Sequence, residues 1–266
     1  MEIGFIGCGN MASAMINGII NSDLIKGEDI IACDRNDYIL ENAQMDFEIN
    51  TTKDMNEVVE KSDIIVIAVK PNGYREVLET IKEKITLDKI IITIAAGISI
   101  NFVEEIIGND KKIIRTMPNT PAFVGEGMTA ICKNKNISEK ELKTIELIFN
   151  SFGESEVLDE SLIDVVVGTS GSSPAFCFMF IEAMADCAVK YGMSRDTAYK
   201  FVSQSLLGSA KMVLESGTHP AKLKDNVCSP GGTTIEGVLK LEEEGFRKSV
   251  ISGMSAVIEK SIKMSK

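Results

Sequence analysis

A short glycine-rich stretch near the amino terminus carries the clearest chemical signature in the chain. Gly7 and Gly9, followed by Ala12, stand directly after the apolar run Ile3–Ile6 and directly before a helical pattern. Gly7 allows a tight turn, Gly9 lets a pyrophosphate approach the backbone, and Ala12 permits close packing of helix on strand. Free N–H groups at the helix start add partial positive charge. We therefore predict a dinucleotide-binding loop; the alternative is a glycine-rich turn without a ligand.

The next apolar run ends at Asp34 and Arg35, whose side chains bear on the choice of dinucleotide. An acidic residue at this place can hold the ribose 2′-OH of NADH, and an arginine can hold the 2′-phosphate of NADPH. Because both are present, the two interpretations are close, and we favour NADPH with NADH also accepted. The alternative for Arg35 is a solvated surface charge.

Two further segments, 68–71 and 95–97, lie at the carboxyl ends of inferred strands. Ligands of parallel sheets lie across the carboxyl ends of the strands, so small residues there let the backbone approach the nicotinamide half. Lys70 is a candidate general acid, although a structural or phosphate-side cation is the interpretation we favour. The expected cofactor-binding residues are Ile6, Gly7, Gly9, Asn10, Met11, Ala12, Asp34, Arg35, Ala68, Val69, Lys70, Pro71, Ala95, Ala96 and Gly97.

A second unusual stretch, 228–236, lies in the carboxyl-terminal half. Gly231 and Gly232 precede Thr233 and a helical pattern, which is typical of a helix N-terminus. Its N–H groups and hydroxyls suit a carboxylate ligand. The alternative is a plain helix start that Thr233 caps, with Glu236 completing a capping box. The two interpretations are compatible.

The chain lacks an obvious catalytic base. Its single histidine, His219, stands beside Pro220, and no pair of carboxylates is marked by spacing. A dehydrogenase that oxidises an alcohol usually needs a base for the hydroxyl proton. The absence therefore favours a substrate with an activated electrophile, such as an imine protonated to an iminium. The protein then contributes positioning and electrostatics.

The predicted secondary structure that positions these loops changes near residue 160, from alternating strands and helices to helices alone. Before it, continuous apolar runs alternate with helical patterns, which predicts a mostly parallel sheet buried on both faces. After it, strand signals disappear and helical segments cover about 176–191, 195–216 and 233–264. We predict an α/β protein: a Rossmann-type domain over 1–160, then an all-helical dimerisation domain over 161–266. The strands are expected at 3–6, 30–33, 64–69 and 90–94, with weaker ones at 112–116, 127–132 and 154–158.

Composition limits the partners. The 266 residues carry a formal net charge of −11 and no local basic cluster, so nucleic acid is not expected. The six cysteines are scattered, which favours free thiols, and too few ligands are grouped for a metal site. No apolar stretch approaches the ~20 residues that span a bilayer, and the start lacks a basic signal region. We expect a cytoplasmic protein without a membrane partner.

The first long helix of the carboxyl-terminal half is too apolar for a lone surface helix, so we expect it to be buried against a second subunit. The alternative is burial against its own domain.

Together these stretches resemble the pyrroline-5-carboxylate reductase family, in order and over essentially the whole chain. The final two of the matching segments are the most specific. The segments are 5–11, 68–71, 95–97, 115–121, 171–175, 180–186 and 227–235.

The resemblance implies hydride transfer from NAD(P)H to the imine carbon of 1-pyrroline-5-carboxylate, giving L-proline. It also implies a homodimer interlocked through the carboxyl-terminal helices, commonly assembled into a decamer of five dimers. Thr234 would bond the ring nitrogen and relay a proton, which makes it the expected catalytic residue. The expected substrate-binding residues are Asn119, Ser229, Gly231, Gly232, Thr233 and Thr234. The rivals are a β-hydroxyacid dehydrogenase, another cyclic-imine reductase and a non-catalytic NADPH-sensing regulator.

Overall fold

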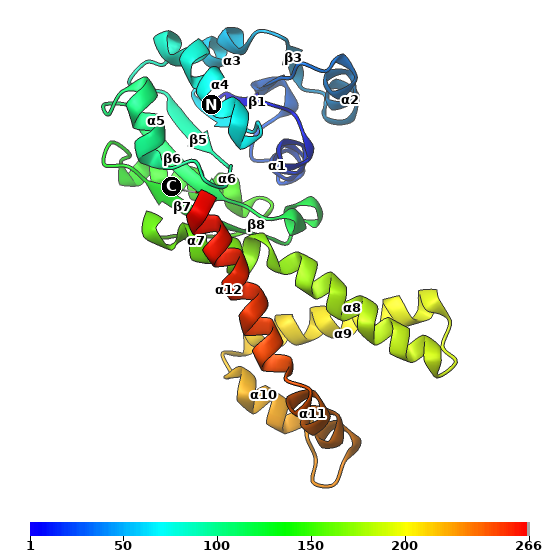
Figure 1. The fold of residues 1–266 in the computed structure, drawn as a ribbon. Coiled ribbons are helices and arrows are strands. Elements are labelled where there is room, and N and C mark those ends of the chain that lie inside the picture. Colours follow the sequence, from blue (N-terminus) through cyan, green and yellow to red (C-terminus); the bar gives the residue numbers. More distant parts are fainter. Residues whose placement is uncertain (265–266) are drawn as a thin grey trace. The chain divides into compact units, whose positions relative to one another are not determined.

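The structure is a computed structural model that describes residues 1–264. The chain divides into two units (Figure 1). The first is Met1–Ser172 together with the final segment that begins at Val257, and the second is Ser173–Ala256. The domain boundary expected at residue 160 stays a prediction.

The first unit is built on one eight-stranded sheet in the order β3-β2-β1-β4-β5-β6-β7-β8. Neighbouring strands run parallel except β6 and β7, which pair antiparallel, so the mostly parallel sheet is confirmed. The apolar runs form fully buried strands, as continuous rather than alternating runs predict. The strands are β1 Ile3–Ile6, β2 Ile30–Cys33, β3 Asn50–Thr52, β4 Ile64–Ile67, β5 Ile90–Thr93, β6 Lys112–Met117, β7 Gly127–Lys133 and β8 Gly153–Val157.

Helices cover both faces of this sheet (Figure 1). One hydrophobic cluster joins the sheet to α1, α2 and α6, and a second joins the opposite face to α3, α4 and α5. Alternate strand residues supply the two clusters, for example Phe5 to the first and Ile6 to the second. The helices of this unit are α1 Asn10–Asn21, α2 Asp37–Phe47, α3 Met55–Lys61, α4 Tyr74–Ile81, α5 Ile100–Ile107, α6 Glu139–Asn150 and α7 Ile163–Val166. Short 3₁₀ turns are η1 Gly27–Asp29, η2 Pro71–Gly73, η3 Lys82–Lys84, η4 Thr120–Val124 and η5 Glu160–Leu162; η6, Val167–Gly171, is a π-helical turn.

The second unit is helical, as expected. It contains α8 Ser173–Lys190, α9 Arg195–Ser216, α10 Pro220–Val227, α11 Thr233–Glu243 and the first part of α12 Phe246–Met264. The helical stretch expected over 233–264 consists of two helices, because Gly245 takes a positive φ of 77° and separates α11 from α12.

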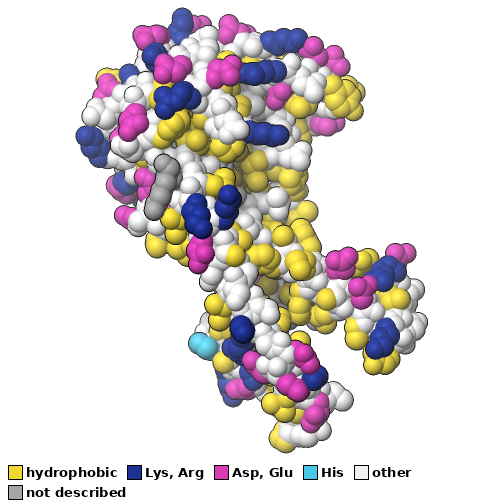
Figure 2. Space-filling model, viewed as in Figure 1, with side chains coloured by type: hydrophobic (Ala, Val, Ile, Leu, Met, Phe, Trp, Pro, Cys, Tyr) yellow, Lys and Arg dark blue, Asp and Glu magenta, His cyan; other side chains and the backbone are white. Residues whose placement is uncertain are grey.

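Apolar side chains lie exposed along the helices of this second unit (Figure 2). Within the described part of the chain, Ala185 is the sole buried residue of α8. Phe178 and Met179 on the same helix are 64% and 67% exposed. A soluble protein rarely leaves such a face in water, so the exposure agrees with the expected burial against a second subunit.

One helical stretch, Glu160–Lys190, is long and apolar enough to cross a membrane by length and composition. The expectation that no stretch reaches that length is wrong by this criterion. Within the described chain, 17% of its most apolar window is buried.

The last turns of α12 belong to the first unit. Ser261 is buried and its hydroxyl donates to a carboxylate oxygen of Asp164 at 2.5 Å. A Cβ placed on Gly97 would lie 3.3 Å from the carbonyl oxygen of Met264. The end of α12 therefore supports the loop that follows β5.

Candidate active site

A hollow of about 580 Å³ opens at the carboxyl ends of β1, β2 and β4. Its size suits a small-molecule cofactor, and its place is the one at which parallel sheets bind ligands. Eight of the expected cofactor residues line it, namely Ile6, Gly7, Gly9, Asp34, Arg35, Ala68, Val69 and Lys70.

The glycine loop has the geometry that its sequence predicts. Gly7 has a φ of 96°, and a Cβ there would come within 2.7 Å of the carbonyl oxygen of Ala68. No larger residue fits without moving the end of β4. A Cβ on Gly9 would meet no described atom within 4 Å. The protein itself therefore leaves room at Gly9, and that room is available to a ligand.

The helix behind this loop begins without a side-chain cap. Gly9 is the N-cap of α1, and no described side chain accepts a hydrogen bond from the first N–H groups of the helix. The first turn, which starts at Asn10 and Met11, carries no acidic residue among the described side chains. Its N–H groups and partial positive charge thus suit the negative charge of a pyrophosphate. Ala12 is buried in the first hydrophobic cluster, in agreement with its expected packing role.

The carboxylate of Asp34 lines the hollow and also accepts hydrogen bonds from two backbone N–H groups. One carboxylate oxygen accepts the N–H of Cys8 at 2.9 Å, and the other accepts the N–H of Asn36 at 3.0 Å. The N–H of Gly7 donates to the carbonyl of Cys33 at 2.7 Å. These bonds join the glycine loop to the end of β2.

Two cations, Arg35 and Lys53, line the hollow near the ends of β2 and β3. Arg35 pairs with Glu76 at 2.7 Å, and Lys53 pairs with Asp37 at 2.6 Å. All four side chains are mostly exposed, so each ion pair contributes little to stability. Sequence reasoning missed Lys53, because it follows the short polar strand β3, which was not expected. The other lining residues that were missed are Cys33, Met55, Gly73, Glu76 and Val77.

Seven expected cofactor residues do not line this hollow. Asn10, Met11 and Ala12 lie in the first turn of α1, and Pro71 begins η2 directly after Lys70. The loop after β5 is half-buried and has a positive φ of 79° at Gly97. It contains the other three residues, Ala95, Ala96 and Gly97.

The side chain of Asn119 makes hydrogen bonds within the protein at both its nitrogen and its oxygen. Its side-chain amide donates to the carbonyl of Ser170 at 3.1 Å, and its oxygen accepts the N–H of Met128 at 2.9 Å. The side chain is nearly buried and joins the loop after β6 to β7 and to the π-helical turn. A role in lining the nicotinamide pocket stays a prediction.

The second expected site begins with a tight turn before α11. The N–H of Gly232 donates to the carbonyl of Ser229 at 3.0 Å, and Gly231 has a φ of 68°, as a turn with glycine in third position requires. Gly232 is the N-cap, so the alternative in which Thr233 caps the helix is wrong. No described side chain caps α11. Thr233 and Thr234 are exposed in its first turn.

Three side chains that could act as a base or a nucleophile, His219, Cys8 and Cys33, are unsuited to that role. His219 is the N-cap of α10, and its Nδ1 accepts the N–H of Ala221 at 3.2 Å. Burial, with the nearby charge of Asp34, raises the pKa of Cys8 and of Cys33 to about 11 and keeps both thiols protonated. Among residues 1–264, no group of three or more His, Cys, Asp and Glu side chains is arranged to hold a metal ion.

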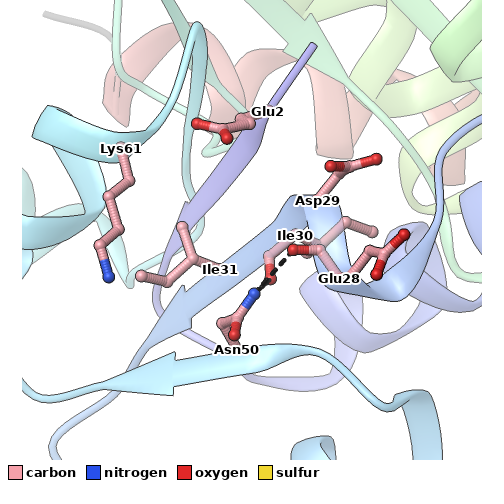
Figure 3. Close-up of a pocket in the computed structure, with 7 residues that line it drawn as sticks. All are labelled: Glu2, Glu28, Asp29, Ile30, Ile31, Asn50 and Lys61. Carbon is pink, nitrogen blue, oxygen red and sulfur yellow. Dashed lines mark hydrogen bonds between the residues drawn. The ribbon is translucent and has the colours of Figure 1, made fainter.

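A smaller hollow of about 110 Å³ lies at the opposite, amino edge of the sheet (Figure 3). Its wall includes the carboxylates of Glu2, Glu28 and Asp29, with Lys61 across from them. The side-chain amide of Asn50 donates to the carbonyl of Glu28 at 2.8 Å. Its volume and excess of negative charge do not suit a dinucleotide, so the larger hollow is the candidate cofactor site.

Comparison with known proteins identifies the family. The family model described as pyrroline-5-carboxylate reductase dimerisation matches residues 160–264, and the one described as NADP oxidoreductase coenzyme F420-dependent matches residues 2–97. Pyrroline-5-carboxylate reductase of Escherichia coli (strain K12) is 48% identical over 265 residues, which cover 100% of this chain and 98% of the relative. The chain belongs to the pyrroline-5-carboxylate reductase family.

Distant members of the pyrroline-5-carboxylate reductase family agree with this assignment. The Arabidopsis thaliana enzyme is 36% identical over 264 residues, which cover 99% of this chain and 95% of the relative. The crystal structure of Plasmodium falciparum pyrroline carboxylate reductase, described as having NADP bound, is 36% identical, with a TM-score of 0.91 over 100% of this chain and 98% of that one. The expected family, fold class and nicotinamide-dependent reductase function are confirmed. The match to the dimerisation family supports assembly into oligomers.

Proposed function

We propose that this chain reduces 1-pyrroline-5-carboxylate to L-proline with NADPH. A hydride leaves C4 of the dihydronicotinamide and bonds to the imine carbon, and the ring nitrogen keeps the proton of the iminium. The products are the secondary amine and NADP⁺. The observation that carries the proposal is the hollow in which Gly7, Gly9 and the uncapped start of α1 meet the end of β4. The names of the full-length relatives support the choice of substrate.

The cofactor would lie across the carboxyl ends of the strands. The pyrophosphate would bind to the N–H groups of the loop 7–12, and the adenosine to the end of β2. The nicotinamide half would rest on the loops 68–71 and 95–97. The bound NADP named for the Plasmodium falciparum structure supports a dinucleotide in this fold.

Preference for NADPH rests on the charges around the adenosine end. Arg35 and Lys53 can both turn toward a 2′-phosphate, whereas Asp34 already accepts two backbone N–H groups. An aspartate that accepts N–H groups has less free capacity to hold a ribose 2′-OH, and its negative charge is partly balanced by those donors. NADH would be accepted with lower affinity.

The substrate would be held by the start of α11. Its carboxylate would accept hydrogen bonds from the backbone of Gly231, Gly232 and Thr233, with Ser229 in the same turn, since these groups form an uncapped helix N-terminus. The hydroxyl of Thr234 would bond the ring nitrogen and act as the proton relay. Asn119 is proposed to support the nicotinamide pocket. No residue is needed to abstract a proton from carbon, which fits the engagement of His219 as a helix cap.

The working form is proposed to be a homodimer joined through the helical unit, with five dimers forming a decamer. A second copy would cover the apolar face of α8, which the chain itself leaves exposed. We therefore assign the apolar stretch Glu160–Lys190 to the dimer rather than to a lipid bilayer. A cytoplasmic location stays a prediction.

One assay tests the function. Purified protein is mixed with NADPH and pyrroline-5-carboxylate, the absorbance of the reduced cofactor is followed, and proline is measured by mass spectrometry. We expect equal amounts of oxidised cofactor and proline. Binding of NADPH without turnover would instead identify a non-catalytic sensor.

A further inference from the structure

One buried hydroxyl occupies a place where the sheet would otherwise have a backbone hydrogen bond. The hydroxyl of Tyr74 donates to the carbonyl of Ile67 at 2.5 Å and accepts the N–H of Ile94 at 3.2 Å. Tyr74 is 0% exposed. Ile67 is the last residue of β4, and Ile94 directly follows β5.

The register of the two strands shows what this hydroxyl replaces. β4 and β5 are parallel, and the N–H of Ile90 donates to the carbonyl of Asp63 at 2.9 Å. In a parallel ladder the donors recur at every second residue, so the pattern predicts a later bond from the N–H of Ile94 to the carbonyl of Ile67. The Tyr74 hydroxyl is inserted between this donor and this acceptor. The strand ends are therefore held apart by one oxygen atom at the carboxyl edge of the sheet.

The same side chain also closes the loop after β4. Tyr74 is the first residue of α4, so its bond to Ile67 joins the two ends of the segment 68–73. The neighbouring strand is held independently, because the hydroxyl of Thr116 donates to the carbonyl of Thr93 at 3.0 Å. Burial raises the pKa of the Tyr74 hydroxyl above its ordinary value, although the N–H groups of Ile94 and Ala95 oppose this effect. The hydroxyl thus stays protonated and keeps donating to Ile67.

We propose that Tyr74 is a positioning residue for hydride transfer, whose hydroxyl sets the separation of the loops 68–71 and 95–97. The inference rests on the proposed function, since those loops are the proposed support of the nicotinamide half. Tyr74 acts through the backbone of both strand ends and does not itself contact the reacting atoms. Hydride transfer depends steeply on the distance between donor and acceptor carbons, so a small shift of either loop slows the chemical step.

Tyr74→Phe tests the proposal, because it keeps the buried ring and removes the oxygen. Without that oxygen the N–H of Ile94 loses its acceptor, and amide exchange of the peptide that contains Ile94 should accelerate. We expect kcat to fall by about tenfold while the Kd of NADPH changes by less than about threefold, since the pyrophosphate and adenosine contacts remain. With NADPH deuterated at C4, the isotope effect on kcat should rise, because hydride transfer limits the variant more strongly.

A matched control separates positioning from stability. Ile148→Val removes one buried methylene from α6, which packs mainly on β8 and β7. It should lower the melting temperature without changing the isotope effect. If Tyr74→Phe behaves in the same way, the positioning role is wrong. If neither the amide exchange at Ile94 nor the isotope effect changes in Tyr74→Phe, the hydroxyl does not set the separation of the two loops.

The same experiment distinguishes an error in the proposed function from an error in the role of Tyr74. In the wild-type protein, NADPH should slow amide exchange in segments 5–12, 68–73 and 94–97. If those segments are not protected, the assignment of the cofactor site is wrong whatever Tyr74 does. If they are protected and Tyr74→Phe transfers hydride at the wild-type rate, the role of Tyr74 alone is overturned.

Discussion

The carboxylate of Asp34 accepts a hydrogen bond from the backbone N–H of Cys8 at 2.9 Å, between the two glycines of the cofactor loop. An acid at the end of β2 therefore holds in place the loop proposed to bind the pyrophosphate. The same atoms that would bind a ribose hydroxyl also hold the loop in shape. We therefore expect the neighbouring cations Arg35 and Lys53, rather than Asp34, to discriminate NADPH from NADH.

Loss of either cation should affect NADPH selectively. We expect Arg35→Ala and Lys53→Ala each to raise KM for NADPH by about tenfold and to leave KM for NADH nearly unchanged, because each removes one charge-assisted bond to the 2′-phosphate. Steady-state kinetics with both cofactors measures this. Lys26→Ala is the matched control, since Lys26 is an exposed lysine paired with Glu28 at 3.5 Å. Equal effects on NADH and NADPH would contradict the assignment.

Gly9→Val should abolish cofactor binding without unfolding the protein. Gly9 has an ordinary φ of −76°, and its added Cβ meets no described atom within 4 Å, so the fold tolerates a side chain. The side chain would occupy the space assigned to the pyrophosphate. Calorimetric titration with NADPH and a thermal melt measure the two effects. Gly7→Ala offers the contrast, because its Cβ would strike the backbone of Ala68 and destabilise the fold. Tight NADPH binding by Gly9→Val would refute the loop assignment.

Thr234→Ala should lower kcat and leave the Kd of NADPH nearly intact. The loss of one positioned hydrogen bond to the ring nitrogen costs on the order of 2–4 kcal/mol of barrier. Thr234→Ser restores the hydroxyl and should recover most of the rate. Thr144→Ala, which changes a threonine on α6, is the control. If turnover is unchanged in Thr234→Ala, this hydroxyl has no part in the mechanism.

Phe178→Glu should separate the subunits. The side chain is 64% exposed on α8, and a buried unpaired carboxylate at an interface is strongly unfavourable. We expect the dissociation constant of the dimer to rise by at least about a hundredfold, as measured by sedimentation equilibrium. Leu147→Glu is the matched control, because Leu147 is 60% exposed on α6 of the first unit. A dimer of unchanged stability would exclude this face of α8 from the interface.

Glu141 should contribute stability at neutral pH that disappears in acid. Burial raises the pKa of its carboxyl group, but hydrogen bonds from Lys112 and Ser138 outweigh burial and lower the pKa from 4.5 to about 2. A lowered pKa in the folded state adds stability above the ordinary value, and this contribution is lost as the pH falls from 4.5 through about 2. Glu141→Gln should reduce the free energy of unfolding by about 2 kcal/mol at pH 7.

Denaturant unfolding at several pH values measures this difference. The gap between wild type and Glu141→Gln should narrow steadily in acid. The exposed Glu154 on β8 provides the control in Glu154→Gln, for which a much smaller change is expected. A gap that stays constant down to pH 2 would contradict the lowered pKa.

The elements that could be predicted from the sequence are those whose own residues form a strong local pattern. The run Ile64–Ile67 is continuous and apolar, so its burial on both faces could be predicted. The strand Asn50–Thr52 could not, because it is short and polar and its pairing with β2 depends on distant residues. Lys53 was missed for the same reason. The glycine loop was predictable since its chemistry is local to the residues around Gly9.

Hydrogen bonds between distant segments escaped prediction. Nothing in the sequence indicates that the hydroxyl of Tyr74 enters the ladder between Ile67 and Ile94, because that bond depends on strand register. The sequence offers Thr233 as the cap of α11 because Glu236 stands in capping-box position. Glycine is about as good an N-cap as threonine, and the turn from Ser229 makes Gly232 the cap.

The return of α12 to the first unit determines how this enzyme can be dissected. A fragment that ends at Ser172 would lack Ser261 and its bond to Asp164, as well as the support that Met264 gives to the loop at Gly97. In terms of chain connectivity the helical unit is an insertion with two junctions, at Ser172 and at Val257. A chimaera that exchanges helical units between relatives must therefore be spliced at both places, and a single crossover would join a sheet to the wrong supporting helix.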